Sequence, residues 1–67
     1  MNLRNLIETA INTNEFVKVS NSLKIAAHKN QDKITIKLFK QGSLIWTDVN
    51  TLDNIIVDLD NEVSNFG

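Results

Sequence analysis

Residues 33–48, KITIKLFKQGSLIWTD, constrain the fold most strongly, because apolar and polar residues alternate on both sides of Gln41 and Gly42. Alternation with a period of two is typical of half-buried strands, and glycine at the centre favours a tight turn. We therefore expect a hairpin with a two-residue turn, or with a four-residue loop of the same centre. A three-residue loop would instead shift the register by one and turn one strand over.

The expected turn assigns the hairpin's side chains to two faces, since opposed residues of an antiparallel pair point the same way. On the core side, Leu38 faces Ile45 and Ile36 faces Thr47. On the opposite side, which we call the outer face, the pairs are Phe39 with Leu44, Lys37 with Trp46, and Thr35 with Asp48. Large apolar side chains among lysines are unusual for a face that meets only solvent.

Residues 23–29 repeat the alternation before a turn that we predict at Asn30 and Gln31. The core-side pairs are then Leu23 with Leu38, Ile25 with Ile36, and Ala27 with Ile34. The outer-face pairs are Lys24 with Lys37, Ala26 with Thr35, and His28 with Lys33. Opposed like charges are mildly unfavourable, and an anionic ligand or a partner would offset that cost.

Residues 15–20, EFVKVS, predict a short first strand, and Asn21 and Ser22 predict its turn. A two-residue turn places Val17 and Val19 on the outer face. An odd loop places both valines in the core instead.

Both ends of the chain carry apolar residues at helical spacing. Residues 3–12 form such a stripe after a predicted N-cap at Asn2. Residues 12–14, NTN, are expected to end this helix, because asparagine tolerates the left-handed geometry of a helix end. A second stripe runs from Leu52 to Phe66 after a predicted cap at Asn50. We therefore predict one α+β domain over residues 1–67, with an antiparallel meander of three to four strands and both helices on its core side.

Composition narrows the function. The chain lacks cysteine, which excludes disulfides and cysteine-ligated zinc and fits a cytoplasmic protein, and it lacks the apolar run of about 20 residues that crosses a membrane. The net charge is -1, but six lysines and one acid lie between Lys18 and Lys40, whereas five acids and no base lie from Asp48 onward. We expect no membrane partner.

The sequence offers little for catalysis. His28 is the one histidine, and the turn residues Ser20, Ser22 and Ser43 have no evident base. The acids after Asp48 lack the glycine and the alternating oxygen ligands of a calcium loop. We therefore predict no enzyme activity, no cofactor, no metal and no small-molecule substrate.

The outer face remains as the candidate site. The predicted protein interface comprises Phe39, Leu44, Trp46, Lys37, Lys24 and Ala26. It would serve a homodimer, or an accessory protein of phage or mobile-element type that docks on a larger protein. The alternative is single-stranded nucleic acid bound by Lys24, Lys33, Lys37, Trp46 and Phe39. Two further possibilities are a face covered by a helix, and an acidic C-terminal helix that inhibits a nucleic-acid-binding enzyme.

The order of elements is similar to that of the double-stranded-RNA-binding domain, which runs helix, three strands, helix. That family carries lysines at the start of its last helix to bind phosphates. Here residues 50–54, NTLDN, hold an acid and no base, so the resemblance implies nothing about function.

Overall fold

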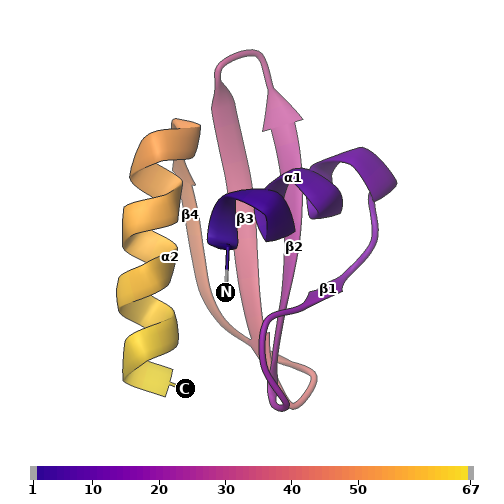
Figure 1. The fold of residues 1–67 in the computed structure, drawn as a ribbon, viewed down its shortest axis with the longest axis vertical. Helices are drawn as coiled ribbons and strands as arrows, with labels where there is room; N and C mark the ends of the chain where they lie inside the picture. The colour runs from indigo at the N-terminus through magenta and orange to yellow at the C-terminus, as the bar shows by residue number, and fades with distance from the viewer. Residues whose placement is uncertain (1, 67) are drawn as a thin grey trace.

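The computed structural model describes residues 2–66 and shows a four-stranded antiparallel sheet with both helices on one face (Figure 1). The strands follow one another in the order β1-β2-β3-β4, which confirms the predicted α+β meander. The elements are α1 (Leu3–Thr13), β1 (Val17–Lys18), β2 (Leu23–Asn30), β3 (Lys33–Lys40), β4 (Ser43–Asn50) and α2 (Leu52–Phe66). Neither helix in the described part of the chain is long and apolar enough to cross a membrane.

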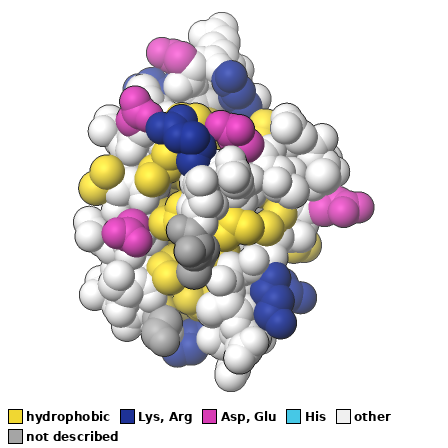
Figure 2. Space-filling view, viewed as in Figure 1, with side chains coloured by type: hydrophobic (Ala, Val, Ile, Leu, Met, Phe, Trp, Pro, Cys, Tyr) yellow, Lys and Arg dark blue, Asp and Glu magenta, His cyan; other side chains and the backbone are white. Residues whose placement is uncertain are grey.

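The core lies between the sheet and the two helices, with α1 over β1 and β2 and α2 along β3 and β4. Three alternate residues of β2 and three of β3 point into it and pack with the buried positions of both helices. Its members are Ile7, Ala10, Val19, Leu23, Ile25, Ala27, Ile34, Ile36, Leu38, Ile55 and Leu59. Figure 2, which looks onto the helices, shows apolar side chains along the middle of this side and charges of both signs around them.

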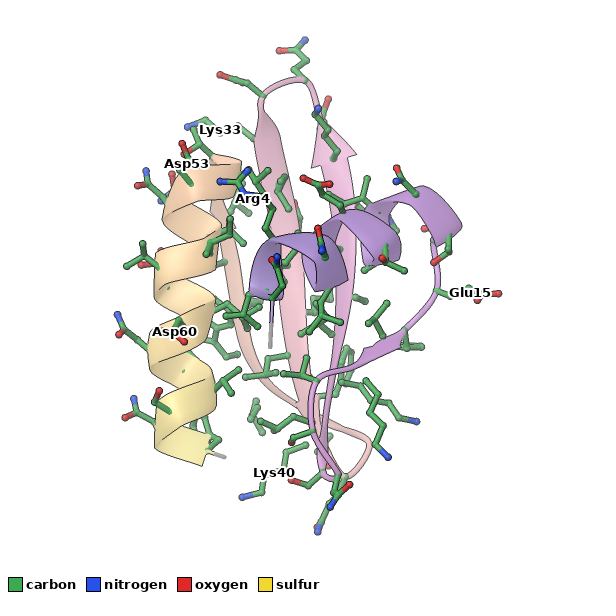
Figure 3. The ribbon with its side chains drawn as sticks, in the orientation of Figure 1. Arg4, Glu15, Lys33, Lys40, Asp53 and Asp60 are labelled. Atoms are coloured by element: carbon green, nitrogen blue, oxygen red, sulfur yellow. The ribbon has the colours of Figure 1, made fainter. Side chains whose placement is uncertain are left out.

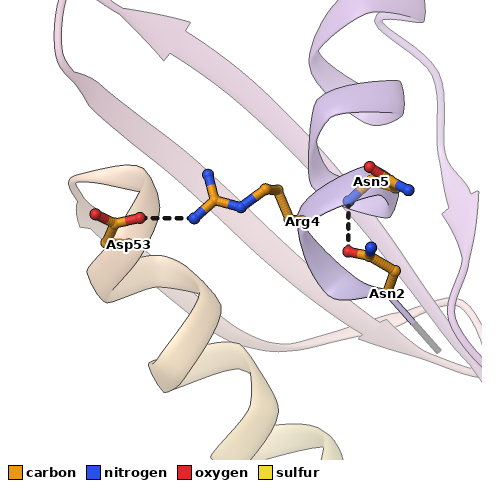
Figure 4. A network of polar contacts seen from close by, with 4 residues as sticks. All are labelled: Asn2, Arg4, Asn5 and Asp53. Atoms are coloured by element: carbon orange, nitrogen blue, oxygen red, sulfur yellow. Dashed lines mark hydrogen bonds and ion pairs between the residues drawn. The ribbon is translucent and has the colours of Figure 1, made fainter.

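Helix α1 is bounded by asparagines at both ends. The Asn2 side chain accepts a hydrogen bond from the Asn5 amide at 3.2 Å, and Asn14 takes the left-handed conformation with φ of 57°. The predicted helix ends are therefore confirmed. Arg4 of α1 reaches Asp53 of α2 at 2.8 Å (Figures 3 and 4). Both side chains are largely exposed, so this ion pair contributes little to stability.

The turn between β2 and β3 lies at Gln31 and Asp32, not at Asn30 and Gln31, so the predicted pairs are wrong by two residues. Ile25 pairs with Leu38 instead of Ile36, and every residue keeps its predicted face. A period of two cannot distinguish registers that differ by two residues, which explains the error. As a consequence, the outer-face pairs are Lys24 with Phe39, Ala26 with Lys37, and His28 with Thr35.

The turn between β3 and β4 is the predicted two-residue turn, with positive φ at both Gln41 and Gly42. Phe39 pairs with Leu44 as expected, but a bulge follows, and Leu38 then pairs with Trp46.

The predicted place of Trp46 on the outer face is therefore wrong. One extra residue in β4, at Ile45, reverses the facing of every later position, so Trp46 packs against the core. For the same reason Asp48 lies on the helix side, opposite Ile36, whereas Thr47 and Val49 face outward.

Strand β1 follows the odd-loop alternative. Val17 pairs with Ile25 on the core side, and Val19 is buried. Lys18 pairs with Lys24 on the outer face, and Phe16 reaches the same face.

Candidate functional site

Residues 2–66 place no helix over the outer face of the sheet. The strand register assigns side chains to this face from all four strands, and Phe16 joins them from the segment before β1. The set is Phe16, Lys18, Lys24, Ala26, His28, Asn30, Lys33, Thr35, Lys37, Phe39, Leu44, Thr47 and Val49.

An apolar cluster of Phe16, Phe39 and Leu44 lies near the β3–β4 turn. The rings of Phe16 and Phe39 meet edge to face, with centroids 5.2 Å apart and an interplanar angle of 86°. Phe16 is 62% exposed and Leu44, opposite Phe39, is 53% exposed. The cluster therefore presents apolar surface to the solvent.

Lysines adjoin this cluster on both sides. Lys18 lies directly opposite Lys24, and Lys24 lies opposite Phe39. Lys37 is on the same face, two residues before Phe39. Lys33 is also on this face, at the opposite end of β3 from Phe39.

The outward positions of the described strands hold no carboxylate. Glu15 points away from the ribbon (Figure 3), and Asp32 lies in the β2–β3 turn. The outer face thus carries one sign of charge, unlike the helix side.

A half-open hollow of about 530 Å³ lies beside the aromatic pair. Its size is within the range of ligand pockets. Its lining is Phe16, Asn21, Ser22, Lys24, Phe39, Gln41 and Gly42. We call it the turn-side hollow.

The structure brings five of the predicted interface residues to one face, namely Phe39, Leu44, Lys37, Lys24 and Ala26. Trp46 is not among them. The sequence analysis did not assign Phe16 and Lys18 to this face. The alternative with an odd-numbered loop at Asn21 and Ser22 would have predicted them, because it turns Phe16 and Lys18 outward when it turns Val17 and Val19 inward.

His28 is exposed on the outer face. Within residues 2–66, no three metal-ligating side chains are arranged to hold an ion.

On the helix side, Asp48 of β4 lies close to Asp58 of α2. A hydrogen bond with the Asp48 carboxyl raises the pKa of Asp58, and partial burial and the negative charges of Asp48 and Glu62 add to the effect. Two carboxylates that share a proton in this way repel each other once both are ionised.

This pair predicts a pH-dependent stability. The pKa of Asp58 in the folded protein lies above its ordinary value of 3.8, so between these two pKa values the folded state binds more protons than the unfolded chain. The stability that Asp58 contributes is therefore fully present below its ordinary pKa and is lost as the pH rises through the raised pKa. We expect Asp58→Asn to stabilise the protein at pH 7 and to leave it unchanged near pH 3, measured by urea unfolding. Asp60→Asn, on the opposite side of α2, is the charge-matched control, and an equal gain from it would contradict the pairing.

No family model matches this chain, and no curated protein or solved structure matches it. The outer face is therefore the feature of this protein that bears on its function.

Proposed function

We propose that this protein is a non-enzymatic binding module that takes single-stranded nucleic acid on its outer sheet face. The observation that carries the proposal is an exposed aromatic side chain, Phe16, set among lysines on a face whose described strand positions hold no carboxylate. Lysines neutralise phosphates, and aromatic rings stack on unpaired bases.

The corrected register favours nucleic acid over a protein partner. Trp46, Val17 and Val19 leave the outer face, and Lys18 joins it, so the face is less apolar and more basic than the sequence predicts. Lysine is depleted at the centre of protein interfaces. A symmetric homodimer through this face would also set lysines against lysines across its two-fold axis.

The geometry suits a strand with unpaired bases. Neighbouring β-strands lie about 4.8 Å apart, so Lys18, Lys24 and Lys37 spread cations over three adjacent strands. In a duplex the bases stack on one another and are not free to stack on a side chain. We therefore expect single strands to bind more tightly than duplexes of the same length, with little preference for sequence.

The test is the double substitution Lys24→Gln with Lys37→Gln. Each lost phosphate contact lowers affinity about tenfold at about 50 mM salt and reduces the slope of log affinity against log salt by about 0.7. The measurement is fluorescence anisotropy of a labelled oligothymidylate, titrated at several salt concentrations.

The matched control is the double substitution Lys29→Gln with Lys40→Gln. It also removes one positive charge from β2 and one from β3, but at positions that the register assigns to the helix side of the sheet. We expect it to change affinity little. Equal losses from both doubles would show that net charge alone governs binding. Competition by polyglutamate as strong as by oligothymidylate would point to an acidic protein surface instead, and no binding at low salt would refute the proposal.

A further inference from the structure

We infer that the turn-side hollow is a subsite for one unpaired nucleobase, which stacks on Phe16 while the flanking phosphates contact Lys18 and Lys24. This inference rests on the proposed function and places one nucleotide of the strand at a defined point of the outer face.

The aromatic pair supplies the stacking surface. Phe16 and Phe39 are in edge-to-face contact. Whether Phe16 presents its edge or one of its faces to Phe39, Phe39 leaves at least one face of the Phe16 ring uncovered. Phe16 is 62% exposed, so the open face is accessible to a base. Phe39 is half-buried and forms the inner wall of the hollow.

Polar groups line the remaining wall. Asn21, Ser22 and Gln41 are among its lining residues, and amide and hydroxyl side chains can both donate hydrogen bonds to a base edge and accept them from it. The backbone N–H of Gln41 donates to the backbone carbonyl of Ser22 at 3.0 Å, which joins the loop after β1 to the β3–β4 turn. This bond links two of the segments that line the hollow.

Charge complementarity favours an anionic chain over a neutral ligand. The lining includes the cation Lys24 and no carboxylate among its described residues. Lys18 is paired directly with Lys24 on the neighbouring strand, so a second lysine adjoins the one that lines the hollow. A phosphodiester strand places a negative charge on each side of every base, which offsets the repulsion between these lysines.

The experiment compares two labelled oligothymidylates of equal length, one intact and one with abasic sites that keep the phosphates. Phe16→Leu retains apolar bulk but removes the flat ring, and its wild-type side chain is exposed, so the fold should survive, as circular dichroism will verify. We expect Phe16→Leu to weaken binding of the intact strand by about 5- to 100-fold and to leave the abasic strand unchanged. Val57→Ala, which truncates an apolar side chain that is 59% exposed on α2 and away from the outer face, should change either affinity less than about twofold.

A second readout uses Phe16→Trp. The wild-type protein has one tryptophan, Trp46, which packs on the core side and should report little on ligand. We expect Phe16→Trp to bind like wild type and to show quenching of the introduced indole by the intact strand but not by the abasic strand. Equal weakening of both strands by Phe16→Leu, or no quenching, would overturn the base subsite while leaving the lysine-dependent binding intact. Failure of the wild-type protein to bind either strand would refute the proposed function as well.

Discussion

Ile36→Ala is expected to lower the free energy of unfolding by about 2–5 kcal/mol, the usual cost of emptying a buried isoleucine site. Ile36 is 0% exposed and lies on the central strand β3, between Ala27 of β2 and Asp48 of β4. It has neighbours on both sides of the strand, so the cavity cannot close by a small shift. Domains of this size have only roughly 3–10 kcal/mol of stability, and the variant should be partly unfolded at 37 °C.

The measurement is urea unfolding followed by circular dichroism. Leu44→Ala is the matched control because Leu44 is 53% exposed on the outer face and the same kind of truncation should cost about 0.5 kcal/mol or less. Similar losses from the two variants would mean that the two sheet faces are not divided as the register indicates.

Trp46→Asp should also be strongly destabilising, by roughly 2–4 kcal/mol, because it places a carboxylate without a partner against Leu38 and the core. If Trp46 lay on the outer face, the same substitution would cost little and would remove an exposed indole. The outcome therefore tests the bulge in β4 directly. The change in unfolding midpoint, at constant urea dependence, is the quantity to measure.

Val49→Asp provides the comparison within the same strand. Val49 is 58% exposed and faces outward, so the new carboxylate stays in water and the cost should be about 1 kcal/mol or less. Equal destabilisation by Trp46→Asp and Val49→Asp would contradict the assigned register.

Periodicity was enough to predict the helices, the hairpin and most of the core. Ile25, Leu38 and Ile55 stand at positions whose spacing determines which side they face, whatever their exact partner. The β2–β3 register was beyond this signal, because pairings two residues apart bury the same side chains. The parity of the loop before β2 was open in the sequence, and the structure resolves it in favour of buried Val19.

The candidate site was harder to predict than the core, because one extra residue in β4 determines which later side chains of that strand face outward. A bulge has no distinctive pattern in the stretch from Ser43 to Asp48, and without it Trp46 would face outward. Lys24 lies on β2, and Lys37 and Phe39 lie on β3, so the bulge in β4 does not change the direction of these side chains. Their predicted face is confirmed. The direction of Phe16 depended on the parity of the loop before β2, which the sequence left open.

The two borders of the sheet differ from the long, flat borders that recruit foreign chains. On one side β1 has two residues, and on the other β4 is interrupted at Ile45 and carries Asp48 on its helix side. Short length, a local twist and an inward-directed charge each hinder the addition of another strand. The meander is thus protected from runaway stacking into fibrils, even though one whole surface of it lies open to the solvent.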